Sequence, residues 1–210
     1  MMARFFNRWY LIGMLAALGV GLLGLFLLRR TAPEAPVPTA AADPSLAAAC
    51  REAFTSISLV QGRGEQAALE GQTVTVQGVV IGDYEGKAPA LRGFFLQDLQ
   101  GDGDPDTSDG LFVFNADQDQ VSLGQVVRVS GTVKEQNGQT QLSSPAGLVL
   151  CGTGSVAPVD VMLPLPAADT LERYEGMLVR LPQALVVSDV YYLGRFGQVT
   201  LSSGARLAQP

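Results

Sequence analysis

Short hydrophobic runs, interrupted by glycine and proline, recur along most of this chain and indicate β-strands. The longest, residues 73–84, reads TVTVQGVVIGDY and alternates between polar and apolar positions before it becomes continuously apolar. Gly78 and Gly82 interrupt it where a strand can bulge or bend. We predict further strands over residues 94–99, 111–115, 126–135 and 140–143.

The connections between these runs indicate how the strands are arranged. Asn137-Gly138 separates the last two runs and is a strong signal for a tight hairpin. A polar connection over residues 116–124 joins the third run to the fourth. A long, glycine-containing first strand followed by four shorter ones predicts an all-β fold with an OB-like five-stranded barrel over residues 46–155. A fragment of a β-sandwich is the alternative.

Residues 156–210 predict a second, smaller β unit. Its strands are expected over residues 177–181, 184–193 and 197–201, with a short one near Arg206. These residues are too few for an independent barrel. The unit therefore either packs on the predicted barrel or is incomplete. We expect packing.

The N-terminal region has a different pattern. Residues 9–28 form a run of 20 residues without a charge, long enough to cross a hydrocarbon core of roughly 30 Å. We therefore predict a membrane anchor, a transmembrane helix, within residues 1–30, and a Pro/Ala-rich linker over 31–45. The protein is then a single-pass protein of the cell membrane with its C-terminal part outside the cytoplasm. If the run is instead a signal peptide and is cleaved, the protein is secreted.

Cys50 and Cys151 are the two cysteines of the chain. An even number of cysteines in an exported segment predicts one disulfide bond between them. In the chain-entropy model, closing so long a loop lowers the entropy of the unfolded state by an amount worth roughly 4.7 kcal/mol. Two free thiols in a cytosolic domain are the alternative.

The chain contains no histidine, which restricts its chemistry. Histidine-dependent hydrolysis is excluded, and two cysteines cannot complete a structural zinc site. Carboxylates that bind a hard cation, Ca²⁺ or Mg²⁺, remain the best supplied route to a site. The segment GDGDPDTSDG concentrates carboxylates, and the candidate ligands are Asp98, Asp102, Asp104, Asp106 and Asp109.

An EF-hand is ruled out at this turn, because Thr107 and Val113 stand where that loop needs Gly and Glu. The alternative to a looser cation site is a solvated turn, in which Asp and Gly residues satisfy the tight backbone geometry. Glu172 and Glu175 flank Arg173, which predicts a local ion pair rather than an acid/base couple.

Several phrases in this order, GVVIG, GFFLQDLQGDGDPDTSDGLFVF, GQVVRVSGTVKEQNGQTQL and LPLPAADTLERYEGMLVRL, resemble the OB-like domain of large bacterial extracellular nucleases. The resemblance covers residues 57–210. It implies an accessory domain that positions nucleic acid or a partner nuclease domain, with an endonuclease/exonuclease/phosphatase-type catalytic domain lying C-terminal to it. The sequence ends at Pro210, which leaves a fragment, a truncated gene or a stand-alone relative as alternatives. We expect the chain itself to be non-catalytic.

Charge opposes a nucleic-acid role for most of the barrel surface. Residues 71–152 contain ten acidic and four basic residues, a net charge of −6 that repels phosphates. Binding therefore requires a locally basic face, and the candidate nucleic-acid-binding residues are Arg128, Lys134, Arg173, Arg180, Arg195 and the aromatic residue Phe95. The alternative function is a calcium-stabilised structural or protein-interaction domain that does not bind nucleic acid.

Overall fold

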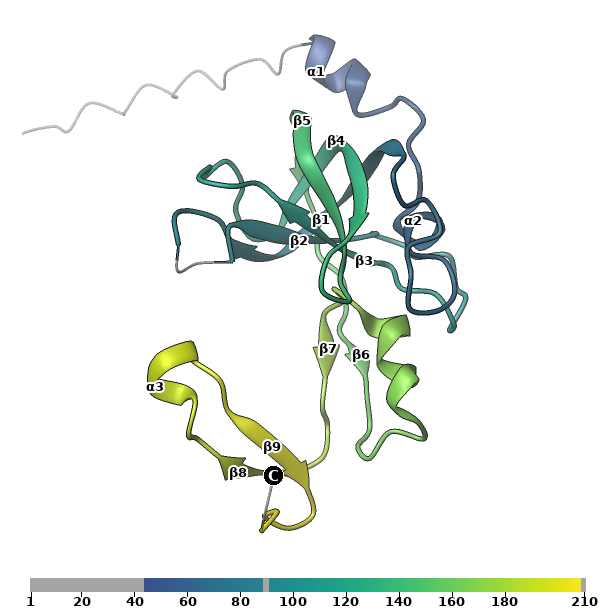
Figure 1. Cartoon of the computed structure of the whole chain (residues 1–210). Helices are drawn as coiled ribbons and strands as arrows, with labels where there is room; N and C mark the ends of the chain where they lie inside the picture. The colour runs from purple at the N-terminus through teal and green to yellow at the C-terminus, as the bar shows by residue number, and fades with distance from the viewer. Residues whose placement is uncertain (1–43, 89–90, 209–210) are drawn as a thin grey trace, which may run out of the picture. The chain divides into compact units, whose positions relative to one another are not determined.

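The computed structural model describes residues 44–88 and 91–208, which fold mainly as β-strands (Figure 1). The prediction of an all-β fold is confirmed. The predicted anchor and residues 31–43 of the predicted linker lie outside the described residues. In the part of the chain that is described, no helix is long and apolar enough to cross a membrane.

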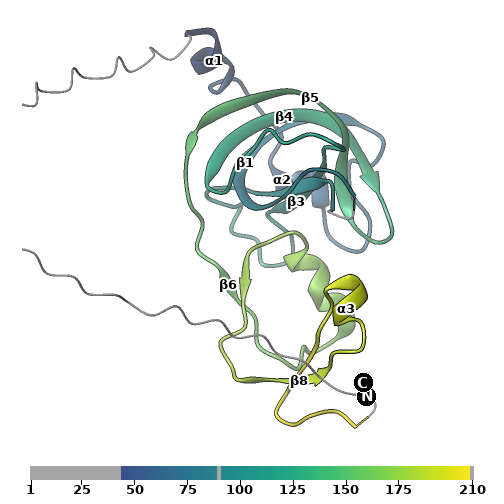
Figure 2. The same cartoon turned by 90° about the vertical axis from the view of Figure 1, so that its left-hand side faces the viewer.

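Five strands of the described chain form a closed barrel. They are β1 (Thr73–Tyr84), β2 (Gly93–Gln97), β3 (Gly110–Phe114), β4 (Gln125–Glu135) and β5 (Thr140–Thr153), in the order β1-β2-β3-β5-β4. The long strands β1, β4 and β5 curve around a common interior (Figure 2). β3 and β5 run parallel, whereas the other neighbouring strands are antiparallel.

The strand boundaries follow the sequence closely, with one exception. The register of β1 against β2 shifts between Val80 and Gly82, next to one of the two glycines that predicted a bulge. Asn137 and Gly138 both have positive φ and join β4 to β5 in a tight hairpin, as predicted. β5 is much longer than expected, because after Ser143 it continues along β4 through a series of register shifts.

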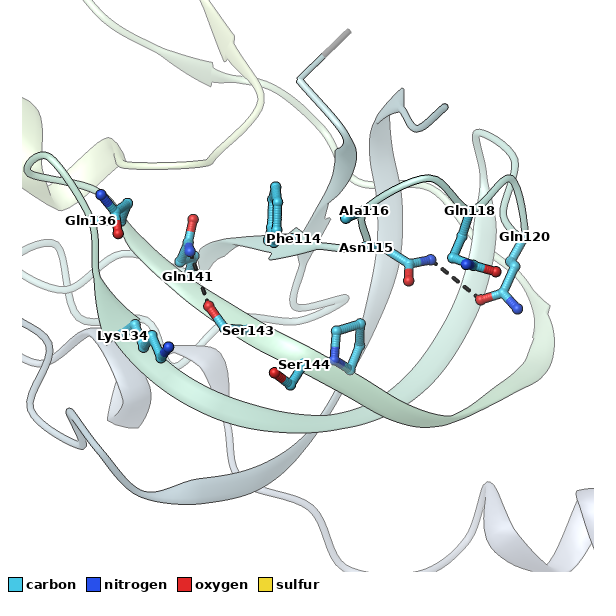
Figure 3. Close-up of a pocket in the computed structure, with 11 residues that line it drawn as sticks. Phe114, Asn115, Ala116, Gln118, Gln120, Lys134, Gln136, Gln141, Ser143 and Ser144 are labelled. Atoms are coloured by element: carbon cyan, nitrogen blue, oxygen red, sulfur yellow. Dashed lines mark hydrogen bonds between the residues drawn. The ribbon is translucent and has the colours of Figure 1, made fainter. Parts of the chain in front are cut away.

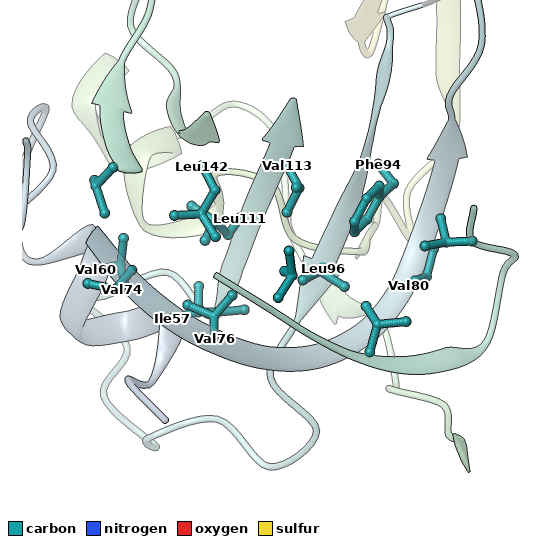
Figure 4. Close-up of a cluster of buried hydrophobic side chains, with 14 of the residues drawn as sticks. Ile57, Val60, Val74, Val76, Val80, Phe94, Leu96, Leu111, Val113 and Leu142 are labelled. Carbon is teal, nitrogen blue, oxygen red and sulfur yellow. The ribbon is translucent and has the colours of Figure 1, made fainter. Parts of the chain in front are cut away.

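The interior of the barrel is filled by alternate side chains of its strands (Figure 4). Phe94, Leu96 and Leu111 are fully buried there. The short helix α2 (Ile57–Gln61) adds Ile57 and Val60 to the same cluster, also fully buried. Burying each of these side chains stabilises the fold by roughly 1.5–3 kcal/mol, so α2 is part of the barrel core rather than a surface addition.

The N-terminal segment is tied to the barrel at two further places. The predicted disulfide bond is present between Cys50, just after α1 (Pro44–Ala49), and Cys151 on β5, with 5.5 Å between the Cα atoms. The Arg128 guanidinium on β4 donates hydrogen bonds to the backbone carbonyls of Glu52 and Ala53, at 2.9 and 2.7 Å. These contacts hold the chain entering the domain against β4 and β5.

The C-terminal part contains two small sheets. β6 (Val159–Asp160) pairs in parallel with β7 (Val179–Arg180), and the 3₁₀ helix η1 (Ala168–Tyr174) lies between them in the chain. β8 (Leu185–Asp189) pairs with β9 (Thr200–Ser203) in an antiparallel hairpin that carries the short helix α3 (Leu193–Phe196). The sequence predicted one strand through residue 193, but the chain turns after Asp189 and residues 193–196 are helical.

Hydrogen bonds join this part to the barrel. The Ser108 hydroxyl donates to the backbone carbonyl of Glu175 at 2.6 Å, and the Leu178 amide donates to the Gln97 side chain at 2.9 Å. Residues 175–178 therefore pack on the barrel, as expected, at the ends of β2 and β3. The predicted division of the chain into separate domains at residue 155 stays a prediction.

Candidate nucleic-acid interface

A groove of about 590 Å³ opens on the barrel where β3 ends (Figure 3). β3 and β5 are paired only through Phe112 with Gln141 and Val113 with Leu142. Beyond Val113 the two strands separate, so side chains rather than backbone hydrogen bonds fill the space between them. The groove is lined by Phe114, Asn115, Ala116, Gln118, Gln120, Lys134, Gln136, Gln141, Ser143, Ser144 and Pro145.

The lining is rich in carboxamides and hydroxyls. The Asn115 amide donates to Gln120 Oε1 at 3.3 Å and to Glu85 Oε1 at 2.5 Å, and the Gln141 amide donates to Ser143 Oγ at 3.0 Å. These bonds hold Asn115 and Gln141, which are both buried, in fixed orientations. Gln118, Gln120 and Gln136 are exposed, so their amide groups are available to a ligand as donors and as acceptors.

The charge of the groove differs from that of the chain. Lys134, an exposed residue on β4, is the one charged side chain among the described residues that line it, and none of those residues is acidic. Arg92 lies close by, with its guanidinium carbon 5.5 Å from the centre of the Phe114 ring. Its positive charge is shared with Asp117, 3.0 Å away. The residues that line the groove therefore carry one positive charge on a protein of net charge −6, while the nearby Glu85 carboxylate, which accepts from Asn115, is negative.

The five predicted cations do not converge. Lys134 lines the groove, whereas Arg128, Arg173, Arg180 and Arg195 do not. Arg128 is buried and its guanidinium is occupied by two backbone carbonyls, so it does not present a charge to phosphate. Arg180 makes a two-pronged ion pair with Asp160, at 2.5 and 2.8 Å. Of these five predicted cations, Lys134 is thus the one that lines the groove, and nucleic-acid binding by the five stays a prediction.

Arg173 and Arg195 each lie over a neighbouring ring. Arg173 lies 5.1 Å from the centre of the Tyr174 ring and 3.9 Å from Asp106. The ion pair that Arg173 makes in the described structure is thus with Asp106 of the aspartate turn, not the local pair with Glu172 or Glu175 that the sequence predicted. Arg195 lies over Phe196 on α3, at 4.9 Å.

Phe95 belongs to an aromatic row on the outside of β1, β2 and β3. Its ring centre lies 6.1 Å from that of Tyr84 and 4.9 Å from that of Phe112. Gly82 and Gly93 leave room for these rings, since a Cβ on Gly93 would lie 2.6 Å from the Phe112 ring. The rings of this row thus cover Gly82 and Gly93 in the sheet. Phe95 also lines a second hollow, together with Met177 and Leu178. Phe95 is thus separate from the polar groove.

The aspartate turn, residues 98–109, satisfies its carboxylates mainly within itself. The Asp104 amide donates to Asp102 Oδ1 at 2.8 Å, and the Asp106 amide donates to Asp104 Oδ1 at 3.0 Å. The hydrogen bond from the Asp104 amide is the main reason why the pKa of Asp102 lies below its usual value. This geometry is that of a tight turn with aspartates bonded to the following backbone.

Arg63, which the sequence did not single out, pairs with two aspartates of the same turn. Its guanidinium contacts Asp104 and lies 3.1 Å from Asp106. Within residues 44–88 and 91–208, no group of three or more acidic, histidine or cysteine side chains is arranged to hold a metal ion. Ca²⁺ or Mg²⁺ binding at the predicted aspartates thus stays a prediction, and the contacts seen are with arginine.

Two carboxyl groups have a clear structural role. Asp98 Oδ2 accepts the amide hydrogen of Ile57 at 3.0 Å, at the start of α2. Burial raises the pKa of Asp98 to about 6, and Asp109 and Asp102 add to it by repulsion. Burial is likewise the main reason why the pKa of Asp109 is raised. Asp98 therefore joins α2 to the turn between β2 and β3, whereas Asp109 Oδ1 accepts the Asp102 amide within the turn, at 3.3 Å.

The groove carboxamides were missed by the sequence analysis, although a signal for them exists. Residues 115–120 read NADQDQ and residues 136–141 read QNGQTQ, so two carboxamide-rich segments follow strands of the barrel. Only the pairing of β3 with β5 brings them to opposite sides of one groove.

No protein-family model matches this chain, and a search of the curated proteins finds no relative of it.

Proposed function

We propose that the barrel is a non-catalytic OB-like module that binds single-stranded nucleic acid in the groove beside Phe114. The observation that carries this proposal is a groove without an acidic lining residue on a strongly acidic protein. The strand order β1-β2-β3-β5-β4 and the place of Gln136 in the β4–β5 hairpin support it, because the loop between these two strands is one of the parts with which OB folds bind oligonucleotides.

The chemistry of the groove fits bases better than phosphates. Exposed carboxamides can donate to and accept from base edges, and Phe114 offers a ring on which a base can stack. One lysine can neutralise only one phosphate. The resemblance to extracellular nucleases supports this ligand class, and the disulfide bond supports a position outside the cytoplasm, tethered by the predicted anchor.

Binding of single-stranded DNA and RNA oligonucleotides of about 12 nucleotides, followed by fluorescence anisotropy at low salt, tests the proposal. We expect the logarithm of the association constant to fall linearly with the logarithm of the salt concentration. The slope should be about −0.7, the value for one phosphate contact on a single strand. Lys134→Ala should remove this slope and weaken binding about fivefold. Lys87→Ala is the matched control, because Lys87 is the other lysine of the chain, is exposed, and does not line the groove.

Phe114→Leu tests stacking independently of charge. Leucine keeps an apolar side chain against the sheet but removes the ring, so affinity should fall by an amount worth about 1–3 kcal/mol with the salt slope unchanged. If neither oligonucleotide binds at low salt, with or without calcium, the nucleic-acid role is eliminated.

A further inference from the structure

The hairpin of β8 and β9 exposes apolar side chains and buries polar ones, which is the reverse of the usual arrangement in a sheet with one face in water. Its cross-strand partners Val187 and Leu201 point to the same face, and they are 51% and 45% exposed. Ser188 and Ser202 are buried instead, and their hydroxyls are 2.6 Å apart. In a sheet with one face in water the apolar side chains normally point inwards.

The polar face of this hairpin is already satisfied by the chain itself. The Leu207 amide donates to Ser188 Oγ at 3.1 Å, Arg206 Nε donates to the Ser188 carbonyl at 3.2 Å, and Ser202 Oγ donates to the Ala205 carbonyl at 2.8 Å. Residues 205–207 therefore cover the serines. The apolar face is left without a cover from the described residues.

The tip of the hairpin, residues 190–199, also exposes apolar side chains. Tyr191 and Tyr192 lie with their ring centres 4.9 Å apart, and Tyr192 lies 5.8 Å from Phe196. The exposed apolar side chains of the tip are Val190, Tyr191, Tyr192, Leu193, Phe196 and Val199, with Tyr191 80% exposed. Six exposed apolar side chains within ten residues, three of them aromatic rings in contact, indicate an interaction surface.

The charge of the hairpin indicates what covers it. Residues 185–207 contain Arg195 and Arg206 and one acidic residue, Asp189, whereas the chain as a whole has a net charge of −6. The tip itself contains no acidic residue, so Arg195 gives residues 190–199 a net charge of +1, and two tips that face each other would repel. Tyrosine, arginine and exposed aliphatic side chains together fit the boundary of an anionic lipid bilayer.

We propose that the hairpin of β8 and β9 inserts the tip at residues 190–199 into the surface of an anionic lipid bilayer. The predicted anchor at residues 9–28 would keep this surface close by, since the linker over residues 31–45 spans roughly 45 Å when extended. The hairpin is then a second membrane contact, beside the anchor. This inference does not rest on nucleic-acid binding in the groove.

Tryptophan fluorescence of the full chain with lipid vesicles tests the inference. Trp9→Phe removes the one native tryptophan, and Phe196→Trp then introduces a reporter at the tip. Leu123→Trp is the matched control on the barrel, because Leu123 is 66% and Phe196 61% exposed. Tyr192→Trp is a second tip reporter in case Phe196→Trp disturbs the fold.

Brominated phospholipids should quench the tip reporter at least about twofold more than the control reporter, because quenching requires contact with the lipid chains. The difference in quenching between the two reporters should increase when phosphatidylglycerol is added to phosphatidylcholine vesicles. Arg195→Gln should make this increase smaller. Equal quenching at the two positions would overturn the inference. A different result would also overturn the inference: brominated lipid does not quench the tip reporter, but rising protein concentration shields it from acrylamide. The apolar face would then be covered by a second copy of the chain.

Discussion

Gly110 and Gly176 are in direct backbone contact: a Cβ placed on Gly110 would lie 2.3 Å from the carbonyl carbon of Gly176. The contact docks residues 175–177 on the start of β3. The Ser108 hydroxyl donates to the Glu175 carbonyl, and the Thr140 amide donates to Glu175 Oε1 at 2.7 Å. The C-terminal part is thus attached to the barrel at a position where only glycine fits.

Gly110→Ala should break this attachment. The added methyl group collides with backbone atoms that have no room to move, so we expect a loss of about 2–3 kcal/mol in the free energy of unfolding. Urea unfolding followed by circular dichroism measures it. Gly194→Ala is the control, because nothing lies within 4 Å of a Cβ there, and it should be neutral or slightly stabilising in the helix α3.

Stability should fall as pH rises through the weakly acidic range. Burial raises the pKa of Glu175 from 4.5 to about 7, with repulsion from Glu135 and Glu172 adding to it. The folded state therefore holds the Glu175 proton more tightly than the unfolded state. The stabilisation that this gives is full below about pH 4.5 and is lost as the pH approaches about 7.

Glu175→Gln should flatten this dependence, since glutamine keeps the Oε1 acceptor for Thr140 without a charge. Melting temperatures between about pH 4.5 and about pH 8 check it. A smaller slope in the same direction should remain from Asp98, whose pKa is also raised. Glu70→Gln, at an exposed position, serves as the control, and an equal flattening in both variants would contradict the role assigned to Glu175.

Reduction of the disulfide bond should destabilise the domain strongly. The bond between Cys50 and Cys151 closes a loop of 101 residues, and its loss should cost roughly 4.7 kcal/mol in the chain-entropy model. Chemical unfolding with and without dithiothreitol measures the cost. Cys50→Ser with Cys151→Ser should match the reduced protein and show no further response to the reductant. A response in that variant would assign the effect to something other than the bond.

Arg63 should determine whether calcium affects stability. Its guanidinium already pairs with Asp104 and Asp106, so calcium should add little to the melting temperature of the wild type. In Arg63→Ala these carboxylates lose their partner, and calcium should raise the melting temperature by several degrees. Arg51→Ala is a control at another exposed arginine. A calcium-dependent rise in the wild type that disappears in Asp104→Ala would instead support the cation site predicted from the sequence.

The structural features that depend on residues adjacent in the sequence were predicted correctly. The alternation over residues 73–84 and the Asn137-Gly138 turn predicted β1 and the β4–β5 hairpin, because strand periodicity and turn geometry depend on adjacent side chains. The disulfide bond followed from the number of cysteines and the predicted compartment. None of these predictions needed knowledge of which distant segments meet.

The predicted sites depended on distances through space, which the sequence does not show. Arg128 was a candidate for phosphate binding, but the fold buries it against the Glu52 and Ala53 carbonyls, 76 and 75 residues away. Arg63 approaches the aspartate turn across 41 residues of sequence. An exposed charge and a buried, paired charge look the same in a sequence, since burial is set by the whole packed fold.

The amino-acid sequence by itself determined the β-strands, the tight hairpin and the disulfide pair of this protein, because those follow from local periodicity, turn residues and cysteine count. Only the tertiary structure decided which side chains line the groove and which are buried. The parallel pairing of β3 with β5 ends at Val113 and Leu142, and the groove lined by Phe114 and Gln141 lies beside it. Likewise, only the packing of residues 205–207 on Ser188 and Ser202 leaves the apolar side of the last hairpin uncovered.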